Sequence, residues 1–152
     1  MQKARFATAA AVVFAIAALA APAWADSAAE AAAMKSLDEY MASFNARDAE
    51  AWSKTLNYPH VRIASGQVRV WQTPEEYVSD FDFAAFAERE RWHHSTWGKR
   101  EVIQSSADKV HIAVTFTRYD AENKPVSSYE SLYVVTLQGG HWGTQARSSF
   151  AP

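Results

Sequence analysis

The clearest pattern in the sequence lies in Lys109–Phe150, which reads "KVHIAVTFTRYDAENKPVSSYESLYVVTLQGGHWGTQARSSF". Apolar and polar residues alternate along most of it, which predicts strands whose successive side chains face opposite sides of a sheet. The polar segment Asp120–Lys124 and the pair Gly139-Gly140 interrupt this alternation, and such segments favour turns. We therefore expect three long antiparallel strands joined as a meander.

Upstream of the meander, the chain alternates between helical and extended patterns. One apolar helical face recurs at Met34, Leu37, Met41 and Phe44. Asp48 is placed to cap a second, shorter helix, and Thr73–Glu76 has the form of a capping box with proline at the first helical position. Between these helices, residues 58–71 predict a β-hairpin, and the segments "WHHSTW" and "REVIQS" predict two more strands.

Helices that precede a run of antiparallel strands indicate the α+β class. We expect three amino-terminal helices packed on a strongly curved antiparallel sheet, in a cone-shaped fold. The hollow of such a cone is the expected place for a binding site.

The first 25 residues have the pattern of a secretory signal peptide. Lys3 and Arg5 precede an apolar, alanine-rich run, and Ala23 and Ala25 supply the small residues of a cleavage site. Residues 26–152 are then a single domain, and the protein is expected in the periplasm or outside the cell. The sequence contains no cysteine, so disulfides and cysteine chemistry are excluded.

The charge balance argues against two kinds of partner. Removing residues 1–25 takes away two positive charges and no acids, which changes the formal net charge from −2 to −4. A mildly acidic domain has no basic stripe for nucleic acid. It also has no polybasic segment for a membrane surface after the signal is cleaved.

Several local phrases resemble the nuclear-transport-factor-2-like (NTF2-like) superfamily, in its SnoaL-like branch. They are "SFNARDAEAW", "YPHVRIASG", "TPEEY" and "GHWGTQARSSF". This resemblance implies the cone-shaped fold, frequent homodimerisation through the sheet and a pocket between sheet and helices. Members include isomerases, dehydratases, cyclases and proteins without known activity. Some members carry a catalytic carboxylate near the first hairpin, but Ile63-Ala64-Ser65-Gly66 offers no acid there.

His60 and Arg62 share one face of the first expected strand, opposite Val61 and Ile63. Two readings stay open. If the apolar face is buried, His60 and Arg62 lie outside or at a dimer contact. If the polar face looks into the cone, His60 is a candidate base and Arg62 a candidate anion clamp.

Three further charged residues lie within the meander. Glu130 is a candidate base if apolar neighbours raise its pKa, or an ordinary exposed glutamate on the outer face. Arg118 ends an apolar strand face and either extends to solvent or lies at the pocket mouth, paired with Glu130. Arg147 belongs either to a binding wall or, with Gln145, to a dimer interface.

His93 and His94 point to opposite faces of a strand, so only one can enter the pocket, and no metal site or cofactor is expected. Aromatic residues are abundant, and Trp71, Trp92, Tyr77 and His94 are candidate pocket residues. Aromatic walls suit a small apolar or aromatic organic ligand.

The function expected first is an exported small-molecule-binding protein. The alternatives are a cofactor-free lyase or isomerase that uses His60 or Glu130 as general base, and a non-catalytic accessory or assembly domain.

Overall fold

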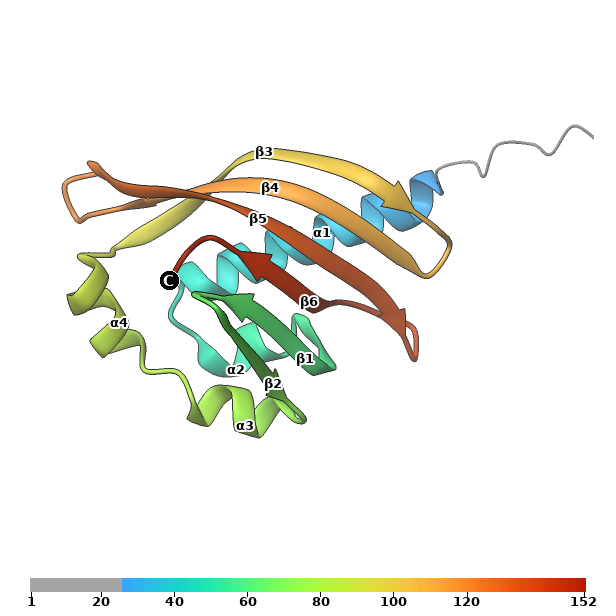
Figure 1. Ribbon diagram of the computed structural model, residues 1–152, viewed down its shortest axis with the longest axis horizontal. Coiled ribbons are helices and arrows are strands. Elements are labelled where there is room, and N and C mark those ends of the chain that lie inside the picture. Colours follow the sequence, from blue (N-terminus) through green and yellow to red (C-terminus); the bar gives the residue numbers. More distant parts are fainter. Residues whose placement is uncertain (1–25) are drawn as a thin grey trace, which may run out of the picture.

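The computed structural model describes residues 26–152, and the predicted signal peptide lies outside the described residues. Within this range the chain forms a curved sheet covered on one face by helices (Figure 1). The helices are α1 (Ser27–Asn45), α2 (Ala49–Ser53), α3 (Pro74–Ser79) and α4 (Phe83–Glu90). The strands are β1 (Leu56–Ala64), β2 (Gln67–Trp71), β3 (His94–Ser105), β4 (Lys109–Tyr119), β5 (Pro125–Gln138) and β6 (His141–Ser149).

The six strands form one sheet in the order β2-β1-β6-β5-β4-β3. The predicted meander β4-β5-β6 and the β1–β2 hairpin are confirmed as antiparallel. The sheet differs from an all-antiparallel one at a single junction, where β1 and β6 run parallel. Parallel neighbours need a long connection, and here the chain between β1 and β6 supplies it.

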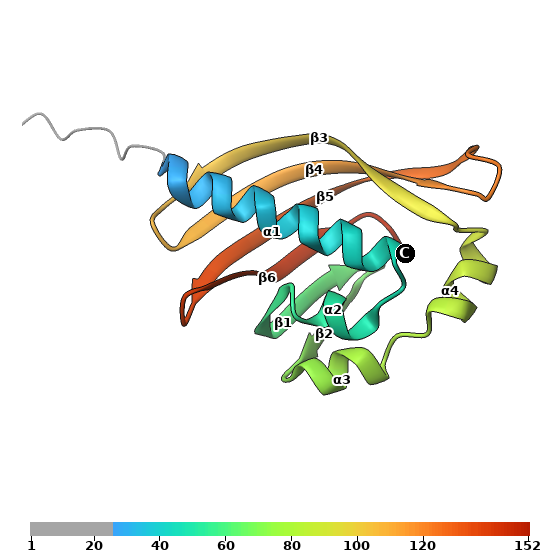
Figure 2. The same ribbon diagram turned by 180° about the vertical axis from the view of Figure 1, so that it is seen from behind.

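β3 unites two segments that the sequence pattern predicted as separate strands. Its register against β4 shifts between Trp97 and Arg100, where the Lys99 amide donates a hydrogen bond to Thr115 Oγ1 at 2.8 Å. A bulge of this kind bends a strand and increases its twist. The sheet consequently curves around α1, which crosses its concave face (Figure 2).

α1 begins at a strong cap and carries the apolar face that the sequence predicted. The Asp26 carboxylate accepts hydrogen bonds from the amides of Ala28 and Ala29, which satisfies donors that a helix start leaves free. Leu37 is fully buried and Tyr40 nearly so, and both belong to the main hydrophobic core.

The helix expected after Thr73 is interrupted, so the helix count is four rather than three in the described chain. Thr73 caps α3 and Pro74 is its first residue, as predicted. α3 ends at Ser79, and Asp82 starts α4 by accepting hydrogen bonds from the amides of Ala84 and Ala85. An aspartate favours such a cap over a helix interior because its side chain competes for backbone amides.

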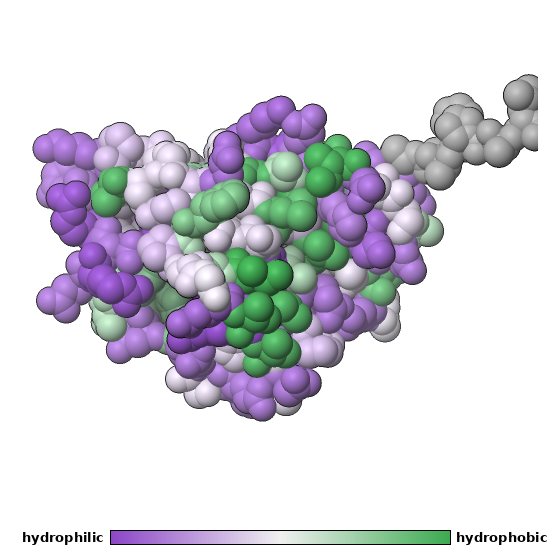
Figure 3. Space-filling model, viewed as in Figure 1, coloured by the Kyte–Doolittle hydropathy of each residue, from purple (hydrophilic) through white to green (hydrophobic). Residues whose placement is uncertain are grey.

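The β1–β2 hairpin turns its apolar side chains outward. Ile63, Val68 and Val70 are 48%, 65% and 48% exposed. Apolar surface gathers on the side of the molecule on which Figure 1 shows β1, β2 and β6 (Figure 3). The polar face of the hairpin therefore points toward the helices.

None of the helices in residues 26–152 is long and apolar enough to cross a membrane.

Candidate functional site

A half-open cavity of about 490 Å³ lies between the concave face of the sheet and the helices. Its walls come from the carboxyl-terminal part of α1, from α3 and α4, from the β1–β2 hairpin and from residues 149–152. The end of the chain lies between α4 and the hairpin (Figure 1). The cavity thus forms where segments from both ends of the domain meet.

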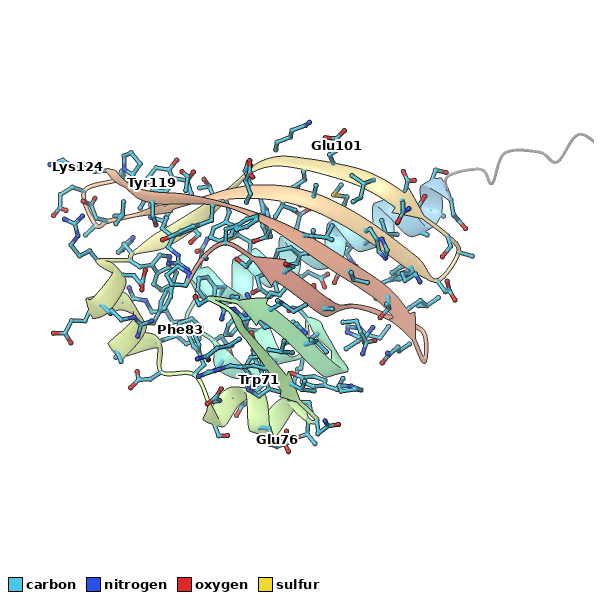
Figure 4. The ribbon with its side chains drawn as sticks, viewed as in Figure 1. Trp71, Glu76, Phe83, Glu101, Tyr119 and Lys124 are labelled. Carbon is cyan, nitrogen blue, oxygen red and sulfur yellow. The ribbon has the colours of Figure 1, made fainter. Side chains whose placement is uncertain are left out.

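Ten of the 26 residues that line the cavity are aromatic. Trp71, a lining residue, lies at the end of β2 beside α3 (Figure 4). Phe83, at the start of α4, is outside the lining and packs against Phe44 and Phe81. The lining side chains with large apolar surfaces are Tyr40, Met41, Phe44, Trp52, Trp71, Tyr77, Phe81, Phe86, Trp97, Phe116 and Tyr133. Their rings contact one another, as in the edge-to-face pairs of Trp52 with Tyr77 and of Trp71 with Tyr77. Such walls favour a ligand with a flat apolar body.

Five arginines also line this aromatic cavity: Arg62, Arg69, Arg89, Arg118 and Arg147. Three have acidic partners: Arg69 with Asp80 at 3.0 Å, Arg89 with Glu90 at 3.1 Å, and Arg118 with Glu90 at 2.7 Å. Arg62 and Arg147 have no acidic side chain within salt-bridge distance among residues 26–152. Arg62 Nη2 donates instead to an oxygen of Pro152, the last residue, at 2.8 Å, which leaves Arg147 as the lining arginine without an anionic neighbour in the described chain.

The two arginines come together at the parallel junction of the sheet. Arg62 of β1 and Arg147 of β6 are direct partners in the strand register, and both side chains reach the cavity. Burial lowers the pKa of Arg62, and the neighbouring charge of Arg147 lowers it further. Two like charges at adjacent positions repel each other, and the repulsion is stronger where water is excluded.

Tyrosine hydroxyls surround the Arg147 guanidinium. It donates hydrogen bonds to the Tyr40 hydroxyl and, at 3.1 Å, to the Tyr77 hydroxyl. Burial lowers the pKa of Arg147, whereas Tyr40, Tyr77 and Tyr133 raise it to a net value above the ordinary one. Burial raises the pKa values of Tyr77 and Tyr133 despite the opposing effect of Arg147. These two phenols are uncharged at neutral pH, so they solvate the guanidinium without neutralising it.

Arg118 has a different environment at the α4 side of the cavity. It is 6% exposed, and its guanidinium lies over the rings of Phe86 and Tyr129 at 4.9 Å and 5.0 Å from their centroids. Its ion pair with Glu90 connects β4 to α4. The expected pairing with Glu130 is wrong, because Glu90 occupies that role. Arg118 therefore holds β4 and α4 together at the cavity wall, and we do not assign it to ligand binding.

The polar face of β1 points inward, but of its two candidate residues only Arg62 lines the cavity. His60 is fully buried, and its ring stacks on Trp71 and meets Tyr77 edge-on. Its Nδ1 lies 2.9 Å from the Thr144 carbonyl oxygen, so Nδ1 carries the proton in the neutral ring. Nε2 is buried and has no hydrogen-bond partner in the described chain.

The structure gathers five of the nine predicted site residues in the cavity wall: Arg62, Trp71, Tyr77, Arg118 and Arg147. Four lie elsewhere. His60 is behind Trp71, and Trp92 is buried against Phe44, Phe83 and Phe86. His94 stacks on Tyr119, and Glu130 is an exposed residue outside the cavity lining.

Sequence reasoning missed Tyr40 and Tyr133, the tyrosines that surround Arg147 with Tyr77. Tyr40 lies between Leu37 and Phe44 on α1, so its position on the buried face was readable from the helical period. Tyr133 shares one face of β5 with Val135. The sequence pattern does not show that the hydroxyls of both tyrosines contact Arg147, which belongs to another strand.

The fold and the cavity together define an α+β protein in which a curved sheet and helices enclose an aromatic hollow. Residues 29–146 match the family described as NTF2-like protein (DUF6841), and the chain belongs to this family. The predicted superfamily is thereby confirmed. Among curated proteins, none matches the chain.

Solved structures with the same fold are distant in sequence. An NTF2-like protein with a cystatin-like fold from Novosphingobium aromaticivorans is 10% identical, with a TM-score of 0.66 and 81% of each chain covered. A Catenulispora acidiphila protein, solved in complex with S-DNPA, is 14% identical with a TM-score of 0.65, covering 82% of this chain and 94% of its own. A ketosteroid isomerase-like protein from Erwinia carotovora atroseptica is 20% identical with a TM-score of 0.55, covering 80% and 96%. At these identities the likeness concerns the fold alone.

Proposed function

We propose that this chain is an exported NTF2-like protein that binds a small, partly apolar organic molecule. The cavity carries this proposal, because its volume of about 490 Å³ and its wall rich in aromatic side chains suit a molecule of metabolite size. A few polar groups on such a wall give a ligand its orientation.

The lining residues divide into two roles. Trp71 and Tyr77 contribute apolar wall area and pack against each other with ring centroids 5.0 Å apart. Arg62 and Arg147 supply donors for a carboxylate, carbonyl or phenolate group of the ligand. The apolar body lies against the aromatic rings while the polar group meets the arginines.

Native mass spectrometry of the protein isolated gently from the periplasm tests this proposal. We expect a chain that begins at Asp26 and carries additional mass from a retained organic molecule. The Trp71→Leu variant, whose Trp71 lines the cavity, should lose that mass. The matched Trp142→Leu variant should keep it, because Trp142 packs against the core away from the cavity lining.

A ligand-free mass, together with an unchanged melting temperature in a broad panel of apolar metabolites, would contradict the binding function. A chain that retains residues 1–25 would contradict export alone.

The lyase or isomerase alternative requires a free base in the cavity. The lining contains two carboxylates, those of Asp80 and Asp82. Asp80 accepts hydrogen bonds from Arg69 and Trp71, and Asp82 caps α4. Since both are engaged and neither His60 nor Glu130 lines the cavity, the contacts favour a binder over an enzyme of this kind.

We also propose that the protein is a homodimer formed through the sheet. The outward apolar side chains Ile63, Val68 and Val70 support this assembly, because monomeric proteins rarely leave large contiguous apolar patches in water.

A further inference from the structure

We propose that the ligand is an organic anion, a flat apolar body with one carboxylate, and that Arg147 and Arg62 hold the carboxylate. This inference rests on the proposed binding function and narrows its ligand to one chemical class. The inference starts from the charge of Arg147.

Arg147 is the primary anchor because its half-buried side chain has no acidic partner among residues 26–152. A guanidinium has five N–H donors, and hydrogen bonds to Tyr40 and Tyr77 use one on each terminal nitrogen. Its Nε atom is buried without a hydrogen-bond partner among residues 26–152. A buried charge without a counter-ion is unfavourable, and a carboxylate is the group that a guanidinium fork binds best.

Arg62 adds a second positive charge at the cavity mouth. Its Nη2 donates hydrogen bonds to the Ala151 carbonyl oxygen at 3.1 Å and, at 2.8 Å, to an oxygen of Pro152, the last residue of the 152-residue sequence. These contacts occupy Nη2 and hold the side chain beside Arg147, so Arg62 is the secondary contact and Arg147 is the charge without an anionic partner. A ligand carboxylate beside Arg147 is attracted by both guanidinium groups, more strongly than a neutral carbonyl is.

The two aspartates of the lining do not cancel this preference. Asp80 is paired with Arg69, and Asp82 is turned to the first amides of α4. Arg69, Arg89 and Arg118 thus have acidic partners near α3 and α4, whereas Arg147 on the sheet has none among the described residues. The geometry discriminates between an acid and its amide, and not only between apolar and polar molecules.

Calorimetric titration with matched acid and amide probes tests this inference. The probes are benzoate, 2-naphthoate and indole-3-acetate, each beside its neutral amide. We expect at least one acid to bind tenfold or more tightly than its amide. In Arg62→Gln the ratio should fall about threefold to tenfold, and in Arg147→Gln it should approach one.

Two further variants keep the test decisive. Arg147→Lys retains the charge and should lower the acid affinity about tenfold, because an ammonium cannot bind a carboxylate in a bidentate manner; it replaces Arg147→Gln if that variant does not fold. Arg100→Gln removes an arginine that pairs with Asp38 and does not line the cavity, and it should leave the ratio unchanged.

The outcomes distinguish a failure of the anion inference from a failure of the proposed binding function. Equal binding of acids and amides, or a preference that is undiminished in both Arg62→Gln and Arg147→Lys, would overturn the anion inference and leave the binding function standing. No binding of any acid or amide would overturn the anion inference together with its basis in a binding function.

Discussion

The His60 imidazole is buried in a place that suits only its neutral form. Burial lowers its pKa, and the charges of Arg147 and Arg62 add to the effect, which together bring the pKa to about 3. The ordinary histidine pKa applies in the unfolded chain. Between about pH 3 and pH 6.5, the unfolded chain therefore carries a proton on His60 that the folded chain does not.

The pH dependence of stability follows from this difference. As the pH falls from about 6.5 toward about 3, His60 should reduce the free energy of unfolding by about 1 kcal/mol per pH unit. Urea unfolding at pH 7 and pH 5 measures the effect. A His60→Gln variant should show less loss between these pH values than the wild type, and a matched His111→Gln variant, whose site is a half-buried one on β4, should behave as the wild type does. Equal losses in all three proteins would contradict the assignment.

The Tyr77 hydroxyl is expected to stabilise the fold through Arg147. In Tyr77→Phe the buried guanidinium loses one of its acceptors, and hydrogen bonds to charged groups contribute about 2 kcal/mol each. The free energy of unfolding, from urea titration, should fall by about that amount. Tyr129→Phe is the control, because the ring of Tyr129 lies over Arg118 and phenylalanine keeps that ring. A Tyr77→Phe variant as stable as the control would exclude the role.

At the scale of elements, the β1–β6 junction depends on a residue without a side chain. A Cβ atom at Gly143 would lie 2.8 Å from the Leu56 carbonyl carbon and 3.0 Å from the Asn57 amide nitrogen. Both atoms belong to the backbone of β1, so the strands would have to separate. A Cβ atom at Gly98 would instead meet a side-chain atom, Thr115 Oγ1, which can turn away at the cost of its hydrogen bond from the Lys99 amide while the backbone stays in place.

We therefore expect Gly143→Ala to be more destabilising than Gly98→Ala, by about 3 kcal/mol against about 1 kcal/mol. Thermal and urea unfolding of the two variants provide the comparison. The reverse order would mean that β1 and β6 can move apart more easily than the Thr115 hydroxyl can rotate.

The sequence predicted which residues share a strand face better than which face is buried. Alternation correctly grouped His60 with Arg62 and Val61 with Ile63. The ordinary expectation buries the apolar pair, yet Ile63 is 48% exposed and His60 is fully buried. Local periodicity carries no information about the partner of a face, because that depends on elements elsewhere in the chain.

The break between α3 and α4 was readable in part. The capping box at Thr73 is predicted correctly, whereas the single helix expected after it divides before Asp82, which caps α4. Asp80 and Asp82 stand close together in "SDFDF", a composition that favours a helix end and a new cap. The signal was present, but the aromatic residues around it continued the apolar face across the break.

At the scale of the whole molecule, the outward apolar face of the hairpin decides the expected assembly. Val70→Lys places a charge on a side chain that is 48% exposed in the single chain. We expect a dimeric wild type and a largely monomeric variant in native mass spectrometry, since an unpaired buried charge disfavours an interface.

The matched control for this assembly is Ile103→Lys, at a site 50% exposed on β3, the opposite edge strand of the sheet. It should remain dimeric. A monomeric wild type at micromolar concentration would exclude the dimer, and equal dissociation of both variants would exclude the hairpin as its centre.

The cone-shaped class was predictable because it follows from the order of helices and strands along the chain. The arrangement of the candidate site was not. Arg62 and Arg147 were each singled out, but their adjacency arises from the parallel register of β1 and β6, which no local pattern specifies.

That junction also sets the time at which the site can appear during folding. β1 is made early in synthesis and β6 last, and contacts between distant segments form slowly because a long loop must close. A nascent or truncated chain without β6 can contain the helices and the hairpin but cannot bring Arg147 beside Arg62. Retention of an anionic ligand would therefore report that the chain is complete and correctly closed, which makes such a ligand a probe of folding quality as well as of function.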